Sequence, residues 1–229
     1  MPGSSALSGA RQVKQYKAVI FDWDGTVMDS TSSIAQAIQA ACVDLELPVP
    51  SAEDASWVIG LSLELALQRC APTLDAGRVP LFMERYRHHF FLRDQTLVMF
   101  DGIIPLFDEL KSREIRLGVA TGKTRLGLDR VLRAQQLADR FDCTRCADES
   151  QGKPHPAMLF DIMERLSLKP EQVLMVGDTT HDIQMATSAG VDSMAVTYGA
   201  HSKRTLLLSE PTVMVSSVRE MRDWLSGRA

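Results

Sequence analysis

Three features that mark other protein classes are missing from this sequence. No apolar run approaches the roughly 18 residues that cross a bilayer, and residues 1–10 lack the basic and apolar regions of a secretory signal peptide. Lysine and arginine form no patch or stripe, and the formal net charge is -4, whereas nucleic-acid-binding domains usually carry a basic patch. We therefore expect no membrane span and no nucleic-acid partner, and we predict that residues 1–15 form a disordered tail.

Cysteine is also scarce, with 4 residues that are scattered along the chain. Cys143 and Cys146 have CxxC spacing, but no second cysteine or histidine pair follows at a spacing typical of zinc ligands. Buried thiols in a reducing compartment are the simpler interpretation. We therefore expect a cytoplasmic protein.

Strand and helix patterns alternate through most of the 229 residues. Residues 17–21 are apolar and predict a buried strand, and further strands are predicted at 116–121, 141–146, 173–176 and 193–196. Between residues 30 and 96 the pattern is helical throughout, with breaks at Gly60, Pro72 and 77–80. This order indicates an α/β fold, a Rossmann-like parallel sheet formed by residues 16–29 and 97–229. Residues 30–96 would be an inserted all-helical domain, called here the helical insertion.

Two carboxylates follow the first predicted strand. Asp22 and Asp24 are two residues apart, and Gly25 allows the backbone to turn sharply after them. The carboxyl ends of parallel strands are where ligands bind in open α/β sheets. Two close carboxylates repel each other unless a cation lies between them or one carries a proton. A solvated Asp-rich turn is the alternative to a functional site.

Three later stretches favour the functional interpretation. They are Val119–Lys123, Gly152–Pro156 and Val176–Asp182. Together with Asp22–Thr26 they resemble, in order, the four motifs of the haloacid-dehalogenase-like hydrolases, over about residues 16 to 200. The long insertion after the first motif is similar to the phosphoglycolate-phosphatase and β-phosphoglucomutase branch. In such proteins the helical insertion acts as a cap over the active site.

The resemblance implies four catalytic residues. Asp22 would be the nucleophile that forms an aspartyl-phosphate intermediate, and Asp24 would be the general acid and base. Thr121 would donate a hydrogen bond to a phosphoryl oxygen. Lys153 would hold the phosphoryl group and offset the charge of the nucleophile.

The resemblance also implies a Mg²⁺ site and further substrate contacts. The metal would be held by Asp22, Asp178 and the backbone carbonyl of Asp24, since Mg²⁺ prefers oxygen ligands. Gly122 and Gly60, with Thr121 and Lys153, would contact the substrate. Asp182 would support the site, or it simply favours the N-terminus of the helix that it begins.

Several neighbouring residues have two interpretations. Lys123 is either a second phosphate contact or a surface charge. His155 and His181 are interpreted as loop or capping residues, and Trp23 as a packing residue whose side chain points away from the site. A basic group in the insertion is interpreted as a charged helix face, with substrate selection as the alternative; its members are Arg85, Arg87, His88, His89 and Arg93.

We therefore expect this protein to be a Mg²⁺-dependent phosphatase that acts on a small phosphorylated metabolite. Phosphoglycolate is the reference substrate. A phosphomutase that acts on a sugar phosphate and a non-catalytic binding module on the same fold are the alternatives. A phosphonate-cleaving relative would need a lysine in the insertion, and the chain has none between Lys17 and Lys111. We expect a monomer or a weak dimer.

Overall fold

The computed structural model describes residues 14–94 and 97–229. Most of the predicted tail, residues 1–13, lies outside the described residues. Its last two members are described: Lys14 forms an ion pair with Asp192, and Gln15 donates a hydrogen bond to the carbonyl of Gly227. Among the described residues, no helix combines the length and the apolar character needed to cross a membrane.

The described part of the chain contains one six-stranded sheet with the strand order β3-β2-β1-β4-β5-β6, and every neighbouring pair is parallel. The strands are β1 (Ala18–Phe21), β2 (Arg116–Thr121), β3 (Cys143–Cys146), β4 (Val173–Gly177), β5 (Asp192–Val196) and β6 (Val213–Val215). The chain moves outward from β1 to β3 and then returns to the other side of β1 with β4. The switch between the two directions therefore lies at β1 and β4, where ligand sites form in such sheets.

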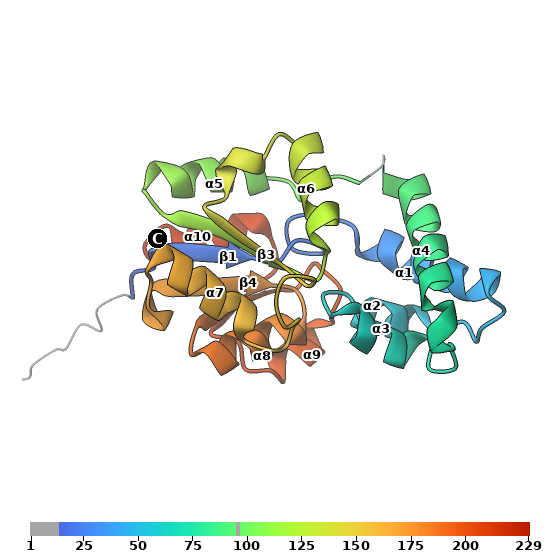
Figure 1. Cartoon of the computed structure of the whole chain (residues 1–229). Coiled ribbons are helices and arrows are strands. Elements are labelled where there is room, and N and C mark those ends of the chain that lie inside the picture. The colour runs from blue at the N-terminus through green and yellow to red at the C-terminus, as the bar shows by residue number, and fades with distance from the viewer. Residues whose placement is uncertain (1–13, 95–96) are drawn as a thin grey trace, which may run out of the picture.

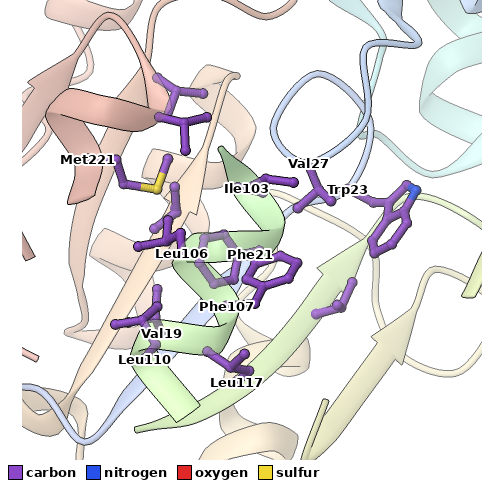
Figure 2. Packing of buried hydrophobic residues seen from close by; sticks show 14 of the residues in the cluster. Val19, Phe21, Trp23, Val27, Ile103, Leu106, Phe107, Leu110, Leu117 and Met221 are labelled. Carbon is purple, nitrogen blue, oxygen red and sulfur yellow. The ribbon is translucent and has the colours of Figure 1, made fainter. Parts of the chain in front are cut away.

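Helices cover both faces of the sheet (Figure 1). The helices of this part are α5 (Ile103–Ser112), α6 (Arg125–Ala134), α7 (Ala157–Leu166), α8 (Thr180–Ala189), α9 (Lys203–Leu207) and α10 (Val218–Leu225). Because side chains alternate along a strand, Val19 and Phe21 face α5, α6 and α10, while Ala18 and Ile20 face α7 and α8. Figure 2 shows the first of these layers, in which Phe21 packs against Phe107 of α5. Burial on both faces explains the continuous apolar strands.

The helical insertion folds as a group of helices beside the sheet (Figure 1). It contains α1 (Thr31–Asp44), α2 (Ala52–Trp57), α3 (Leu63–Cys70) and α4 (Val79–Asp94), and its apolar residues form a cluster of their own between α1 and α4. Its two connections to the sheet domain run side by side, because Met28 forms a bridge with Met99 and Asp29 donates a hydrogen bond to the carbonyl of Val98. The α/β fold with helical insertion is confirmed, while the domain boundaries at 29 and 97 stay predictions.

The predicted elements of the sheet domain are confirmed with small shifts in their bounds. Strand β3 begins two residues later than predicted. At that point the amide of Asp142 still donates to the carbonyl of Leu117, but the side chain of Asp142 turns back and accepts from the amide of Leu117. Gly190 ends α8 with a positive φ of 70°, as expected for a C-terminal glycine. Short η1 (Ala76–Arg78), η2 (Ala138–Arg140) and η3 (Pro170–Gln172) turns complete the described elements.

Candidate active site

The carboxyl ends of β1 and β4 bring two of the predicted carboxylates together. Asp22 directly follows β1, and its backbone amide donates to the carbonyl of Val176 in β4. Gly25 has a φ of 83°, and a side chain there would collide with the carboxylate of Asp178. Three carboxylate oxygens lie within 4.8 Å of one another, one from each of Asp22, Asp178 and Asp182. The turn at Gly25 is therefore what lets Asp178 approach the end of β1.

Lys153 is fully buried between two of these carboxylates. Its Nζ lies 2.6 Å from Oδ1 of Asp22 and 2.7 Å from Oδ1 of Asp182. Burial alone would lower the pKa of Lys153, but the charges of Asp182 and Asp22 outweigh it and hold the pKa above its ordinary value. Lys153 is thus a charged residue inside the protein and not a solvated loop lysine.

The contacts of Asp182 are compatible with both interpretations that the sequence left open. Its Oδ2 accepts hydrogen bonds from the amide and the hydroxyl of Thr179, which completes a capping box at the start of α8. Its Oδ1 contacts Lys153. Oδ1 therefore lies against Lys153 and Oδ2 against the start of α8, and these contacts favour a supporting function for Asp182.

The carboxylates outnumber the cations around this point. The carboxylates of Asp22, Asp24, Asp178 and Asp182 are offset by the two ammonium groups of Lys123 and Lys153. Burial and the charges of Asp22 and Asp182 raise the pKa of Asp178, and burial raises that of Asp22. Among the described residues, Oδ2 of Asp22 has no hydrogen-bond partner. An excess of two negative charges and an unpartnered carboxylate oxygen fit a divalent cation with oxygen ligands.

Two hydrogen bonds fix the orientation of the carboxylate of Asp178. Oδ1 accepts from the hydroxyl of Thr26 at 2.9 Å, and Oδ2 accepts from the amide of Ala200 at 2.6 Å. Neither hydrogen bond was predicted from the sequence. Each carboxylate oxygen retains lone pairs for a metal.

Asp24 lies at the edge of this group. Its Oδ1 accepts from the hydroxyl of Ser30 at 2.6 Å and lies 2.9 Å from Nζ of Lys123. Ser30 directly precedes α1, but its side chain does not cap that helix. Lys123 is therefore not a free surface charge. Its ammonium group forms an ion pair with the side chain of Asp24.

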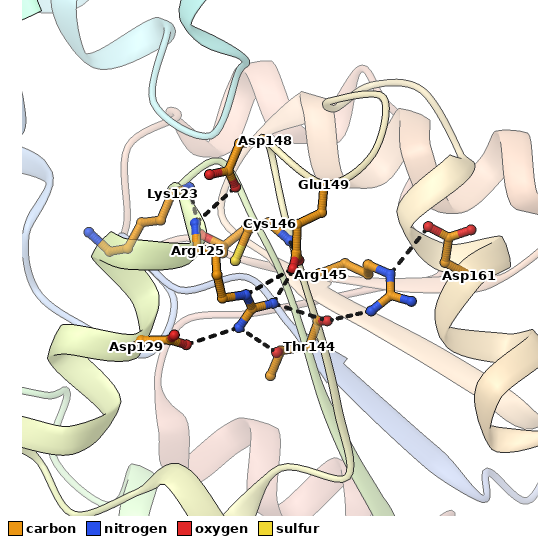
Figure 3. Close-up of polar contacts among 10 residues, drawn as sticks. Lys123, Arg125, Asp129, Thr144, Arg145, Cys146, Asp148, Glu149 and Asp161 are labelled. Atoms are coloured by element: carbon orange, nitrogen blue, oxygen red, sulfur yellow. Dashed lines mark hydrogen bonds and ion pairs between the residues drawn. The ribbon is translucent and has the colours of Figure 1, made fainter.

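Hydrogen bonds with residues 144–149 fix the segment that carries Lys123. Arg125 donates its amide to Asp148 and its guanidinium to Thr144 and Glu149, while the carbonyl of Lys123 accepts from the amide of Ala147. Figure 3 shows these contacts, with the side chain of Lys123 turned away from them. The network joins the loop after β2 to the loop that leads to Lys153.

Thr121 and the two predicted glycines meet where the insertion approaches the sheet. Thr121 is buried and its hydroxyl accepts from the amide of Lys123. Gly60 has a φ of 87°, and a Cβ on Gly122 would lie 2.8 Å from the carbonyl oxygen of Gly60. The loop of the insertion therefore rests directly on the loop after β2.

Two histidines contact the insertion, and the sequence predicted this contact for neither of them. His181 and His201 each lie within hydrogen-bond distance of the carbonyl of Trp57, at 2.8 and 3.0 Å. A carbonyl only accepts, so both Nε2 atoms carry the proton. Burial lowers the pKa of both imidazoles, which favours the neutral form. His181 is thus a buried residue that contacts the insertion and not a capping residue. His155 is a loop residue, and its Nδ1 accepts a hydrogen bond from the amide of Ala157.

Gly122→Ala is expected to lower activity without unfolding the protein. The added Cβ would meet backbone atoms of Gly60, which have no freedom to rotate away, so the loop of the insertion must lift. Displacements of about 1 Å at a catalytic site reduce turnover by up to about 100-fold. We expect kcat/KM to fall about 10- to 100-fold and the thermal midpoint to stay within a few degrees. Gly227→Ala, whose Cβ meets nothing within 4 Å, is the control; equal activity of the two variants would show that this contact is not needed.

Comparisons with known proteins agree with this geometry. The sequence model of a family described as haloacid dehalogenase-like hydrolase matches residues 19–196. A protein of Dickeya dadantii named "Probable phosphatase IndB" is 36% identical in an alignment 210 positions long that covers 89% of this chain and 90% of that protein. The phosphoglycolate phosphatase of Escherichia coli is 28% identical in an alignment 228 positions long that covers 90% of each chain.

Solved structures give the same result for the fold. A "predicted phosphatase" from Clostridium acetobutylicum superposes with a TM-score of 0.81 at 25% identity, over 93% of this chain and 99% of that one. A hydrolase from Pseudomonas syringae has a TM-score of 0.84 at 18% identity, over 92% and 98%. With a family match across most of its length, this chain belongs to the haloacid dehalogenase-like hydrolases.

Proposed function

We propose that this hydrolase is a Mg²⁺-dependent phosphatase that cleaves a small phosphorylated metabolite through an aspartyl-phosphate on Asp22. The observation that carries the proposal is the buried group at the carboxyl end of β1. Asp22 has one oxygen next to Lys153 and one oxygen without a hydrogen-bond partner among the described residues. A carboxylate held in this way has a free lone pair for attack on phosphorus.

In the first step, Oδ2 of Asp22 would attack phosphorus and the bond from phosphorus to the leaving oxygen would break. Lys153 would offset the charge on the nucleophile and on the phosphoryl oxygens. Asp24 would give its proton to the leaving oxygen, so the alcohol departs neutral. Ser30 and Lys123 would hold the carboxyl group of Asp24 in position for this transfer.

In the second step, Asp24 would take a proton from a water molecule, whose oxygen attacks the phosphorus of the intermediate. The bond to Asp22 would break and inorganic phosphate would leave. Thr121 would donate to a phosphoryl oxygen. The loop of the insertion around Gly60 would exclude other water from the intermediate.

Mg²⁺ fits the residues present, and Asp22, Asp178 and the backbone carbonyl of Asp24 would hold it. When bound, it would neutralise charge on the phosphoryl oxygens and orient them. Asp182 would act indirectly, through Lys153 and the start of α8.

The substrate would be a small phosphate monoester of the phosphoglycolate kind. Support comes from the relatives, several of which are named phosphoglycolate phosphatase. A cytoplasmic location is in line with four cysteines that are all free and buried.

The function is tested by phosphate release from a panel of substrates in the presence of Mg²⁺. Phosphoglycolate, sugar phosphates, nucleotides and pyrophosphate cover the open alternatives. We expect one small monoester to be hydrolysed with the highest kcat/KM. Formation of an isomer without release of phosphate would indicate a mutase instead, and no turnover of any substrate would contradict the proposal.

The metal is tested separately by chelation and by stability. Activity should disappear with excess chelator and return with Mg²⁺, but return poorly with Ca²⁺, which takes more ligands in looser geometry. A ligand at 100 times its Kd stabilises a protein by about 2.7 kcal/mol, so Mg²⁺ should raise the thermal midpoint by roughly 5–10 °C for a protein of this size. Asp178→Asn should raise the Mg²⁺ requirement at least about tenfold. Full activity in the presence of chelator would overturn the assignment.

A further inference from the structure

Two buried imidazoles of the sheet domain contact one carbonyl of the insertion. Trp57 ends α2, and the Nε2 atoms of His181 and His201 lie 2.8 and 3.0 Å from its carbonyl oxygen. The two histidines are only 2% and 4% exposed. The indole of Trp57 meets the ring of His181 edge to face, with ring centres 4.5 Å apart, and lies nearly parallel to the ring of His201 at 5.8 Å. We call this arrangement the Trp57 contact.

The Trp57 contact is next to the segment of the insertion that reaches the site. Residues 58–62 join α2 to α3. A Cβ on Gly122 would lie 2.8 Å from a backbone oxygen of this segment, and a Cβ on Gly152 would lie 2.9 Å from the side chain of Ser62. The segment therefore touches both the loop after β2 and the loop before α7. Because the Trp57 contact lies one residue before the segment, it limits how far the segment can move from the site.

His201 also contacts a predicted ligand of the metal. Its backbone amide donates to the carbonyl of Asp178 at 3.3 Å, and the amide of Ala200 donates to Oδ2 of Asp178 at 2.6 Å. A Cβ on Gly199 would lie 2.2 Å from the same Oδ2, so this stretch of chain packs directly on the carboxylate. In the part of the chain that the structure describes, the side chain of His181 forms no hydrogen bond with Asp178. The two histidines thus share one partner in the insertion but differ in their contact with the metal site.

The imidazole of His201 is fixed at both nitrogens. Its Nδ1 accepts from the amide of Thr180 at 3.1 Å, and a neutral imidazole has one acceptor and one donor nitrogen. Nε2 therefore carries the proton and donates a hydrogen bond to the carbonyl of Trp57. Because the backbone of His201 is bonded to Asp178, a displacement of Asp178 also displaces the donor that Trp57 receives.

We propose that His201 is a positioning residue that links Asp178 to the insertion, so that Mg²⁺ binding and the docking of residues 58–62 stabilise each other. The inference rests on the proposed phosphatase function, in which Asp178 holds the metal. A cation that fixes the carboxylate of Asp178 also fixes the stretch of chain packed on it, and the imidazole of His201 is then aligned with the carbonyl of Trp57. The coupling has the same size in both directions, since linkage between two equilibria is reciprocal.

Hydrogen exchange of the whole protein, measured by mass spectrometry with excess chelator or with saturating Mg²⁺, tests the link. Peptides that cover residues 56–62 report on docking. Helix α10 takes part in none of these contacts, so its peptides report on the general stabilisation by the metal. In the wild type, Mg²⁺ should slow exchange in residues 56–62 about three- to tenfold more than in α10, which corresponds to one hydrogen bond.

Two substitutions of His201 separate its two side-chain contacts. In His201→Asn, Oδ1 takes the place of Nδ1 and still accepts from Thr180, but the side chain is too short to reach Trp57. In His201→Gln, the amide nitrogen takes the place of Nε2 and donates to Trp57, while the acceptor for Thr180 is lost. The Asn variant should lose the additional effect of Mg²⁺ on residues 56–62, and its Kd for Mg²⁺ by calorimetry should rise about three- to tenfold. The Gln variant should keep both values within about twofold of wild type.

His181→Asn is the matched control. It removes a donor to the same carbonyl but leaves the contacts of Asp178 in place. Exchange in residues 56–62 should become faster by a similar factor with and without Mg²⁺, and the Kd for Mg²⁺ should stay within about twofold of wild type.

The outcomes separate this inference from the proposed function. If the wild type binds Mg²⁺ in the calorimeter but exchange in residues 56–62 does not respond beyond α10, the link is overturned without recourse to any variant. Equal behaviour of His201→Asn and His201→Gln, or of His201→Asn and His181→Asn, would also overturn it, because a purely structural function would affect them alike. Each of these results leaves the phosphatase proposal intact. A wild type that neither binds Mg²⁺ nor hydrolyses a phosphate ester would overturn both.

Discussion

Asp22→Asn should abolish turnover and leave the fold intact. The amide has nearly the same shape as the carboxylate but is not a nucleophile for phosphorus, and removal of a catalytic nucleophile reduces kcat by about 10⁶-fold in well-studied enzymes. We expect a loss of at least about 10⁴-fold in phosphate release.

The same substitution should not destabilise the protein. Burial and the neighbouring charges of Asp182 and Asp24 raise the pKa of Asp22, while Lys153 lowers it. The charged form is therefore held in place at an energetic cost that the amide avoids. Lys153 keeps its contact with Asp182 in the variant. The thermal midpoint should equal or exceed that of the wild type, as is common where a functional site trades stability for activity.

Two measurements check the assignment of Asp22. Asp223→Asn, at an exposed carboxylate in α10, is the control and should keep full activity. Mass spectrometry after rapid acid quench should detect one added phosphoryl group on the wild type and none on Asp22→Asn. A folded Asp22→Asn protein that retains more than about one per cent of the activity would contradict covalent catalysis, provided that the mass confirms the amide.

The sheet and the position of the site were predictable because they depend on local patterns. Val173–Gly177 is apolar at nearly every position since the strand is buried on both faces. The motif residues lie at the end of such strands or directly after them. Asp22, Thr121 and Asp178 therefore had to lie at one edge of a parallel sheet. The helix that begins at Thr31 was equally clear, because Ile34, Ile38 and Ala41 recur on one face.

The contacts that orient these residues were not predictable, because they depend on the turn after β1 or join distant parts of the chain. Ser30 looks like a capping residue, and only the turn that brings it to Asp24 reveals its other partner. The amide of Ala200 donates a hydrogen bond to Asp178, which is 22 positions away in the sequence. His201 contacts the carbonyl of Trp57, which is 144 positions away. Lys123 was ambiguous for the same reason: its sequence neighbours do not show that Asp24 is 2.9 Å away.

Lys153→Met should remove both activity and much of the stability. Lys153 is the cation between Asp22 and Asp182, and all three side chains are buried. Removal of one partner from a buried ionic group costs about 3–5 kcal/mol, because the remaining charges lose their compensation. For a protein of this size each kcal/mol lowers the thermal midpoint by about 2–4 °C, so we expect a decrease of roughly 10 °C. Lys203→Met, at an exposed lysine in α9, should change neither property.

A double variant separates the structural part of this effect from the catalytic part. In Lys153→Met combined with Asp182→Asn, one cation and one anion are removed together, and the new side-chain amide oxygen still accepts from the backbone amide of Thr179 as the carboxylate of Asp182 does. Stability should therefore recover by at least half, as judged by thermal and urea unfolding. Activity should stay at least about 10³-fold below wild type, because the phosphoryl group still lacks its ammonium. Recovery of activity together with stability would mean that Lys153 only holds the two carboxylates apart and has no function in phosphoryl transfer.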